Sequence, residues 1–188
     1  IATPAEEKVI RYLSEGYAAA GFEPGGPNGQ WTQDVILNRF TQSNVRASLK
    51  LGDWTLPMTQ GREVAISTRR PAEHVSLKDA PLVFVGYGIT APERNWDDFK
   101  DVDVRGKIIV VLVNDPDFEQ PELNTFNGRA MTYYGRWTYK FEEAARQGAV
   151  AALIVHNAAG VGYGWNVVIS PGGENYDIVR APDALSSL

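Results

Sequence analysis

Two apolar runs of strand length, joined by a helical stretch, constrain the fold of this chain more than any other feature. The runs cover residues 107–113 (KIIVVLV) and 149–155 (AVAALIV). Runs that are apolar on both sides are typical of strands in a parallel sheet covered on both faces. A helix predicted within residues 136–147 and ended by Gly148 connects them. The pattern therefore predicts a βαβ unit with a right-handed crossover, and we expect the rest of the chain to be built against it.

The predicted helix has two chemically distinct sides. Its apolar residues recur at helical spacing, at Trp137, Phe141, Ala144 and Ala145. Its opposite side carries Lys140, Glu142, Glu143 and Arg146. The pattern predicts that Phe141, Ala144 and Ala145 are buried against the sheet. It also predicts that the two glutamates and Arg146 are largely exposed.

The composition is that of an ordinary globular protein. The chain has 188 residues, of which 44% are hydrophobic and 22% charged, enough for one domain or one domain plus part of another. A net charge of −5 argues against nucleic acid as a partner. No apolar run approaches the roughly 20 residues that span a bilayer, so no membrane partner is expected. The absence of cysteine excludes disulfides and thiolate metal sites.

The first residues predict a helix. Thr3, Pro4 and Glu6 match a capping box, with proline at the first helical position. Apolar residues then follow on one face, at Val9, Ile10, Leu13 and Tyr17. Gly21 ends this helix, and the PGGPNG stretch at 24–29 predicts a loop. Because the helix starts almost at once and no signal peptide is visible, we expect the sequence to begin inside a longer protein.

Short strands between glycine and proline residues characterise the region before the βαβ unit. Residues 45–51 alternate cleanly, and Gly52-Asp53 leads into 54–56, which predicts a hairpin. Further strands are predicted at 31–40, 63–67, 75–77 and 82–89, and a final short one at 167–169. The sequence thus predicts a mixed α+β chain, α/β in its second half and β-rich in its first.

Carboxylates are the first candidates for chemistry. Four aspartates lie close together, at Asp97, Asp98, Asp101 and Asp103. They lack the glycine and terminal glutamate of a calcium loop, so a solvated acidic turn is the favoured interpretation over a cation site. Asp115 and Asp117 follow a predicted parallel strand, at the end where ligands bind in such sheets. Turn chemistry explains the Asn-Asp-Pro-Asp sequence equally well and is favoured.

The chain has two histidines, His74 and His156. A zinc hydrolase needs at least three protein ligands and an open position for water. The two histidines stand in unrelated elements, and we expect no metal ligands in this chain. His156, at the end of a strand, is interpreted as a residue hydrogen-bonded to the backbone.

A dense aromatic run precedes and enters the predicted helix, at Tyr133, Tyr134, Trp137 and Tyr139. Packing on the sheet is the favoured interpretation, but exposed aromatic residues beside arginine are also typical of recognition surfaces. The glycine-rich segments 86–88 and 160–164 are interpreted as tight turns. The candidate substrate- or partner-binding residues are Arg129, Tyr133, Tyr134, Arg136 and Trp165.

Three segments carry a resemblance to a known family: LVFVGYGI (82–89), WDDFKDVDVRGKIIVVLVNDPDF (96–118) and MTYYGRWTYKFEEAARQGAVAALIVHN (131–157). They resemble the protease-associated domain, in the version inserted in family-28 zinc metallopeptidases. Residues 2–26 are similar to the first helix and loop of the catalytic domain of those enzymes. The resemblance implies a swivelling β/β/α fold, with residues 1–42 belonging to the catalytic domain and 43–188 forming the protease-associated domain.

The resemblance further implies that the parent protein is an exported, secreted or periplasmic hydrolase with two zinc ions. The family's His-x-Asp motif is absent here, and no catalytic residue can be assigned. The leading hypothesis is therefore an accessory domain of a di-zinc, aminopeptidase-like exopeptidase that covers the active-site cleft and shapes access of peptides. Its partners would be the parent catalytic domain and a peptide or protein substrate.

Two alternatives stay open. The first is a protein–protein interaction module with no role in catalysis. The second is a free-standing hydrolase that uses Asp115, Asp117 and His156.

Overall fold

The computed structural model describes residues 3–170 and 174–179. The chain divides into two compact units, Ile1–Leu37 and Asn38–Leu188, which are described separately.

Helix α1 (Pro4–Ala19) dominates the first unit. Thr3 is its N-cap residue and Pro4 its first residue, as predicted, and Gly21 follows it with a left-handed φ of 83°. The predicted capping box is wrong in one respect, because the Thr3 side chain makes no capping bond. The N–H of Glu6 instead donates to the backbone carbonyl of Thr3 at 2.9 Å. A short 3-10 turn follows at Pro27–Gly29.

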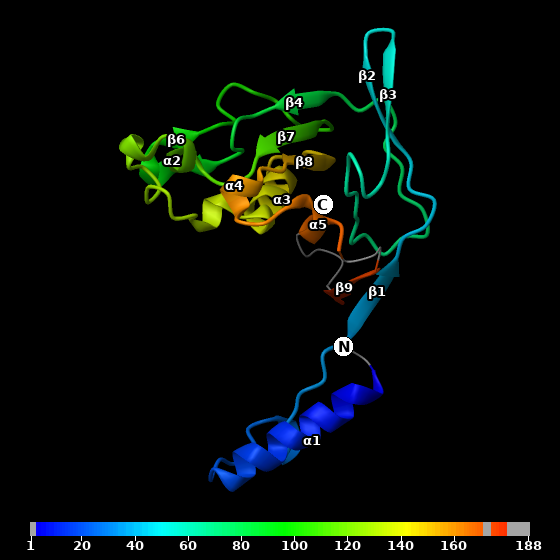
Figure 1. Cartoon of the computed structure of the whole chain (residues 1–188), viewed down its shortest axis with the longest axis vertical. Helices are drawn as coiled ribbons and strands as arrows, with labels where there is room; N and C mark the ends of the chain where they lie inside the picture. Colours follow the sequence, from blue (N-terminus) through cyan, green and yellow to red (C-terminus); the bar gives the residue numbers. More distant parts are fainter. Residues whose placement is uncertain (1–2, 171–173, 180–188) are drawn as a thin grey trace. The chain divides into compact units, whose positions relative to one another are not determined.

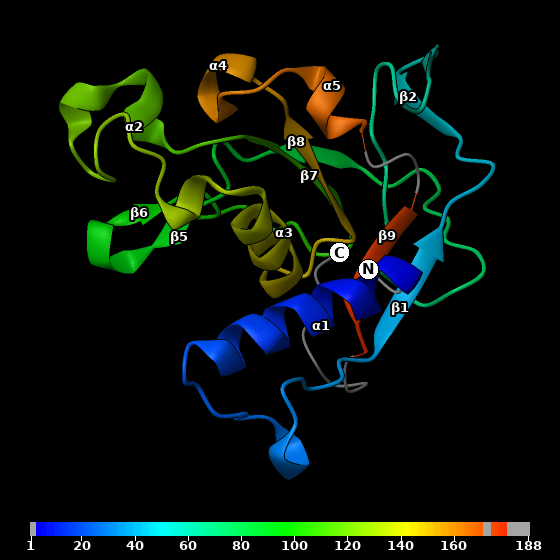
Figure 2. The same cartoon turned by 60° about the horizontal axis from the view of Figure 1, so that its bottom comes forward.

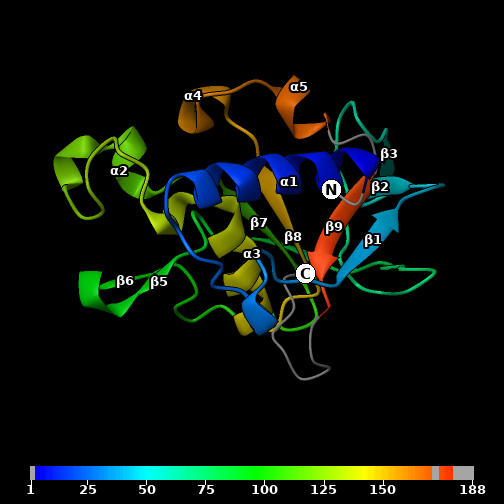
Figure 3. The ribbon, with the colours of Figure 1, turned by 90° about the horizontal axis from the view of Figure 1, so that it is seen from below.

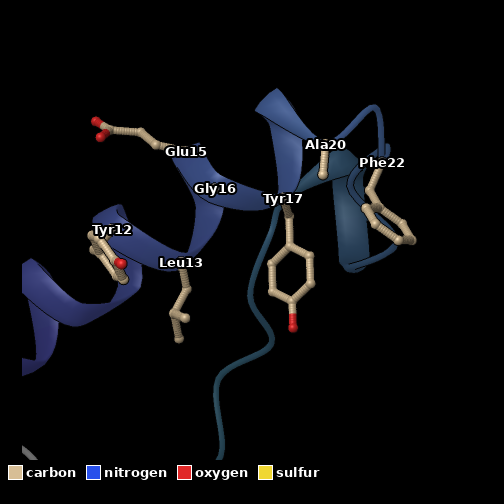
Figure 4. A pocket seen from close by; sticks show the side chains of 7 residues that line it. All are labelled: Tyr12, Leu13, Glu15, Gly16, Tyr17, Ala20 and Phe22. Atoms are coloured by element: carbon tan, nitrogen blue, oxygen red, sulfur yellow. The ribbon is translucent and has the colours of Figure 1, made fainter.

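Within the first unit, the apolar face of α1 is uncovered. Val9, Leu13 and Tyr17 are 54%, 48% and 53% exposed, and no residue of the helix is buried. Figure 4 shows Leu13 and Tyr17 pointing to the same side of the helix, away from Glu15, where they line a shallow pocket with Phe22. The predicted helix is therefore confirmed, and its apolar face is not covered by its own unit.

A parallel sheet forms the centre of the second unit (Figure 1). It consists of β4 (Leu82–Phe84), β7 (Ile108–Leu112) and β8 (Ala151–Val155), in the order β4-β7-β8. Ile108 lies opposite both Leu82 and Ala151, and both strand pairs are parallel. Helix α3 (Trp137–Arg146) connects β7 to β8 in the chain and ends beside Gln147. The predicted parallel neighbours and their connecting helix are confirmed.

Helix α3 packs on one face of this sheet, as the views in Figures 1 and 3 show. The core beneath it is mostly aliphatic, with Phe99 as its aromatic member, and Ile109, Val111 and Ala144 are completely buried. Gly148, with a φ of 76°, ends the helix and leads into Ala149, whose N–H donates to Ala144. This tight exit returns the chain to the sheet after one short helix.

The buried face of α3 differs from the predicted one. Ala144 is buried, but Phe141 and Ala145 are only half-buried. Lys140 and Glu143, predicted on the opposite side, are buried instead. Glu143 tolerates burial because it accepts hydrogen bonds from Arg146 (2.7 Å) and Gln147 (2.8 Å).

The β-rich part contains fewer strands than predicted. The hairpin is confirmed, with β2 (Ala47–Leu51) antiparallel to β3 (Trp54–Met58) and Leu51 opposite Trp54. The strand predicted at 31–40 is present only as β1 (Leu37–Thr41), which pairs with β9 (Glu174–Ile178). The strand predicted at 82–89 is present only as β4, and a turn follows at Gly86, as predicted.

Three predicted strands are wrong. Residues 63–67 make only an isolated bridge, Gln60 to Val64, because the Gln60 side chain bonds both backbone groups of Ile66 in place of a partner strand. Residues 75–77 are exposed and form no regular secondary structure. Residues 167–169 fall in and just after helix α5 (Trp165–Val168), since three apolar residues are too few to distinguish a helical from a strand period.

Short elements connect the larger ones (Figure 2). Strands β5 (Thr90–Ala91) and β6 (Trp96–Asp97) pair antiparallel around a 3-10 turn at Pro92–Arg94. Helix α2 (Pro116–Glu119) and a 3-10 turn at Pro121–Leu123 follow β7. A 3-10 turn at Tyr133–Gly135 precedes α3, and helix α4 (Ala158–Val161) follows β8. The glycine segment 160–164, predicted as a tight turn, therefore lies partly within α4.

Candidate recognition surface

Four buried polar residues lie at the carboxyl end of the parallel strands, namely Asn114, Asp115, Asp117 and Lys140. A fifth, Glu143, is buried further along α3 beside Arg146 and Gln147. The carboxyl ends of the strands are where ligands bind in open parallel sheets. The geometry of each group decides whether it is available for a ligand or is already used within the fold.

Lys140 joins α3 to two strand ends. Its side chain is 0% exposed, and its Nζ donates to the carbonyl oxygens of Tyr87, after β4, and Asn114, after β7. Burial lowers the pKa of Lys140 to about 7, against the opposing effect of the nearby Asp98 and Asp115 carboxylates. With its protons committed to backbone carbonyls, Lys140 braces the strand ends.

Asp117 holds in place the segment that follows β7. Its carboxylate is buried and accepts four backbone N–H groups, from Thr125, Phe126, Asn127 and Gly128, at 2.7–3.1 Å. Burial alone raises the pKa of Asp117, but these four donors outweigh it and lower the pKa below its usual value. Contrary to prediction, Asp117 therefore does not act in a local turn, but lies in helix α2 and bonds to backbone amides 8–11 positions along the chain.

Asp115 is also consumed within the fold. One carboxylate oxygen accepts the N–H and the hydroxyl of Thr132, at 3.1 and 2.7 Å. Its other oxygen, Oδ1, is buried with no hydrogen-bond partner among the described residues. Asp115 thereby ties the end of β7 to the segment that leads into α3.

The acidic turn at 97–103 is only partly solvated. Asp97 and Asp101 are exposed. Asp98 is half-buried and accepts hydrogen bonds from the Ile89 N–H and the Trp96 indole, both at 3.0 Å. Burial raises its pKa. Asp98 therefore connects β6 to the turn after β4.

His156 does not bond to the backbone, contrary to prediction. Its ring lies among three aromatic rings, those of Trp137 (6.5 Å between centroids), Tyr163 (5.9 Å) and Trp165 (5.7 Å). Neither ring nitrogen has a hydrogen-bond partner among the described residues. The ring is held by packing between α3, β8 and α5. No sequence signal indicated this cluster, because its members are far apart in the chain.

Three of the predicted recognition residues lie together at the start of α3. Tyr133 is 52% exposed and Arg136 is exposed, while Tyr134 is half-buried. The Tyr133 hydroxyl donates to Glu142 at 2.9 Å, and this bond raises the pKa of Tyr133. We define the recognition surface as Tyr133 and Arg136, with Arg129 beside them in sequence.

Aromatic rings pack beneath the candidate recognition surface. The Tyr134 ring packs edge-on against Phe126 (5.6 Å) and Tyr139 (4.9 Å). Its hydroxyl donates to Glu93 at 2.6 Å, which raises the pKa of Tyr134. Such ring pairs fix orientation as well as adding stability. Tyr134 is thus a supporting residue rather than an exposed one.

Arg129 and Trp165 differ from that group. Arg129 is exposed, and within residues 3–170 and 174–179 neither it nor Arg136 forms an ion pair. Trp165 belongs to the His156 cluster, and its indole N–H reaches the Gly61 carbonyl at 3.4 Å. The structure therefore assigns Trp165 a packing role and leaves the arginines available.

A comparison of the sequence with known protein families identifies the domain that carries this surface. Residues 78–184, more than half of the chain, match the sequence model of the PA domain. The chain belongs to the PA (protease-associated) domain family. No curated protein and no solved structure gave a significant match.

The PA match covers the parallel sheet, α3 and the recognition surface, and leaves out α1 and the β2–β3 hairpin. The mixed α+β architecture agrees with membership of this family. Within the described part of this PA chain, no helix is long and apolar enough to cross a membrane.

The described residues also do not fit the zinc site implied for the parent. None of their His, Asp and Glu side chains gather in a group of three or more that could hold a metal ion. His156 is enclosed by aromatic rings, and the Asp117 carboxylate already accepts four amides. We therefore derive no chemistry through zinc on these residues.

Proposed function

We propose that this chain is the accessory PA-domain portion of a di-zinc, aminopeptidase-like exopeptidase, and that it binds peptide or protein substrates beside the parent's active site. The observation that carries the proposal is the recognition surface. Tyr133 and Arg136 are exposed at the start of α3, and the aromatic base formed by Tyr134, Tyr139 and Phe126 holds their segment in place. Exposed tyrosine and arginine on a rigid support are typical of binding hot spots.

The buried ionisable groups support this assignment over a free-standing hydrolase. A catalytic acid, base or nucleophile must reach the substrate. Lys140 and Asp117 are each 0% exposed and bonded to backbone groups. Asp115 holds Thr132. These groups build the sheet edge that presents the recognition surface.

The first unit supports a catalytic domain as a partner. The apolar face of α1, with Val9, Leu13 and Tyr17, has no cover within the described residues of the first unit. A large exposed apolar face marks an interaction site. In the proposed protein this face packs into the peptidase domain, which also supplies the two zinc ions. Such a protein would be secreted or periplasmic.

The test is a kinetic comparison in the full-length peptidase that carries this domain. Arg136→Ala and Tyr133→Ala are assayed on peptides of increasing length, and Arg62→Ala, an exposed arginine outside the PA match, is the matched control. We expect KM to rise about fivefold or more for long peptides, since loss of a hot-spot contact costs about 1 kcal/mol or more. The kcat for the shortest substrate should not change, and Arg62→Ala should match the wild type.

The interaction-module alternative predicts another outcome. If the recognition surface recruits a separate protein, both variants keep wild-type KM and kcat at every peptide length. In that case the accessory role in substrate selection is wrong. Thermal melting of each variant confirms that a kinetic change does not come from unfolding.

A further inference from the structure

The dipeptide Asn-Gly occurs twice in the sequence, at Asn28-Gly29 and Asn127-Gly128. Asparagine before glycine is chemically labile, because glycine has no Cβ to hinder its own backbone nitrogen. That nitrogen, once deprotonated, attacks the side-chain carbonyl carbon of the asparagine. The new C–N bond closes a succinimide ring and ammonia leaves. Water then opens the ring at either carbonyl, which gives aspartate or isoaspartate.

The first of these dipeptides is open to this reaction. Asn28 and Gly29 are both exposed, in the turn that follows α1. Two backbone bonds close the turn, from Gly26 N–H to Gln30 (2.8 Å) and from Gln30 N–H to Pro27 (3.2 Å). Neither bond uses the Gly29 N–H, and no side-chain acceptor bonds to it among the described residues. No carboxylate therefore holds the proton of the attacking nitrogen at this site.

The second dipeptide has the same sequence but a different environment. Asn127 is also exposed, yet the Gly128 N–H donates to the Asp117 carboxylate at 3.0 Å and the Asn127 N–H to the same oxygen at 3.1 Å. Asp117 is itself 0% exposed and held by two more amides, those of Thr125 and Phe126. The carboxylate opposes deprotonation of the Gly128 nitrogen in two ways. It holds the proton that must leave, and its negative charge disfavours an anionic nitrogen beside it.

We propose that Asn28 is a site of spontaneous deamidation and isomerisation, and that Asp117 protects Asn127 from the same reaction. Each event at Asn28 replaces a neutral amide by a carboxylate, which changes the formal net charge from −5 to −6. Isoaspartate also adds a methylene group to the backbone of the turn. The modified chain is therefore separable from the unmodified chain by ion exchange.

The experiment incubates the full chain in mildly alkaline buffer and follows both sites by peptide mass spectrometry, with ¹⁸O-labelled water to mark succinimide opening. Native Asn28 should deamidate at least about tenfold faster than Asn127. The hydrogen bond from the Gly128 N–H to a charged carboxylate is strong enough to reduce the population with a free Gly128 N–H by that factor. In concentrated urea the two rates should converge, through acceleration at Asn127. Gly29→Ala should slow Asn28 and leave Asn127 unchanged.

The variant Asp117→Asn tests the protecting group directly. If it folds, deamidation at Asn127 should accelerate while that at Asn28 stays constant. If it does not fold, the comparison of native and urea-unfolded wild type decides the question. Equal rates at the two sites in the native chain, or faster reaction at Asn127, would overturn the proposal.

Discussion

Helices α1 and α3 show opposite relations between sequence and burial. In α1 the apolar residues Val9, Leu13 and Tyr17 are about half exposed. In α3 the charged residues Lys140 and Glu143 are buried. Helix α3 has partners within the chain, namely strand-end carbonyls for Lys140 and Arg146 and Gln147 for Glu143. The comparison teaches that a charged side chain is buried where the fold offers it hydrogen-bond partners. It also teaches that an apolar helix face does not by itself ensure that another part of the same chain covers it.

The largest loss of stability is expected at Asp117, the buried carboxylate that accepts the most backbone hydrogen bonds among the described residues. Asp117→Ala removes the acceptor of four backbone N–H groups. We expect the free energy of unfolding to fall by about 3–5 kcal/mol, because the amides are left without a partner. Urea unfolding measures the change. The control is Glu119→Ala in the same short helix, an exposed carboxylate that should cost less than about 0.5 kcal/mol.

The two helices can be compared directly through their lysines. Lys140→Ala in α3 leaves one buried and one partly buried carbonyl without this donor and should reduce the free energy of unfolding by about 3 kcal/mol. Lys8→Ala in α1, where the side chain is exposed, should stay within about 0.5 kcal/mol. Equal effects in urea titrations of the two variants would remove the distinction between the helices.

Lys140 also predicts a pH dependence. Its pKa is about 7 in the folded chain and about 10.4 when unfolded. Between these values the unfolded state binds more protons, so the free energy of unfolding should rise with pH, by on the order of 1 kcal/mol per pH unit. Above this window the trend should reverse, because burial raises the pKa of Tyr139 to about 12 and the folded state then holds the extra proton.

The matched variant for this prediction is Lys140→Met, which keeps the volume and removes the titrating group. Its free energy of unfolding, measured by urea titration from neutral to moderately alkaline pH, should lack the rise. A wild-type profile that is flat or falling over that window would show that Lys140 does not titrate as described.

The smallest effect is expected on α1. Leu13→Ala should cost less than about 1 kcal/mol in this chain, since Leu13 is only half buried. Ile109→Ala, in the core beneath α3, should cost about 2–5 kcal/mol by the same assay. If the chain is part of a peptidase as proposed, the cost of Leu13→Ala should increase in the full-length protein, because the proposal places this face against the catalytic domain. A large cost already in this chain would mean that α1 is packed within it.

Local patterns predicted the central unit well. The runs at 107–113 and 149–155 and the glycine at 148 specify strand, helix and strand from neighbouring residues alone, and the structure pairs the strands in parallel. The hairpin at Gly52-Asp53 was equally predictable, because turn chemistry and alternation agree there.

What the sequence could not predict depends on partners that are distant in the chain. Lys140 is buried because Tyr87 and Asn114 present carbonyls to it, 53 and 26 positions away. His156 is enclosed by rings from three separate elements. Within the recognition surface, exposure of Tyr133 and the supporting role of Tyr134 depend on their bonds to Glu142 and Glu93. Periodicity carries no information on such pairings.

The central claim is that the polar groups at the sheet edge are structural and that catalysis belongs to the parent's other domain. The most direct test incubates the purified chain with zinc and aminoacyl-nitroanilide substrates, then measures bound metal after dialysis and the rate of nitroaniline release. The account predicts no stoichiometric zinc and no turnover above the buffer rate, with His156→Ala behaving like the wild type. Stoichiometric zinc, together with turnover that disappears in His156→Ala, would contradict the accessory role and support a hydrolase built on Asp115, Asp117 and His156.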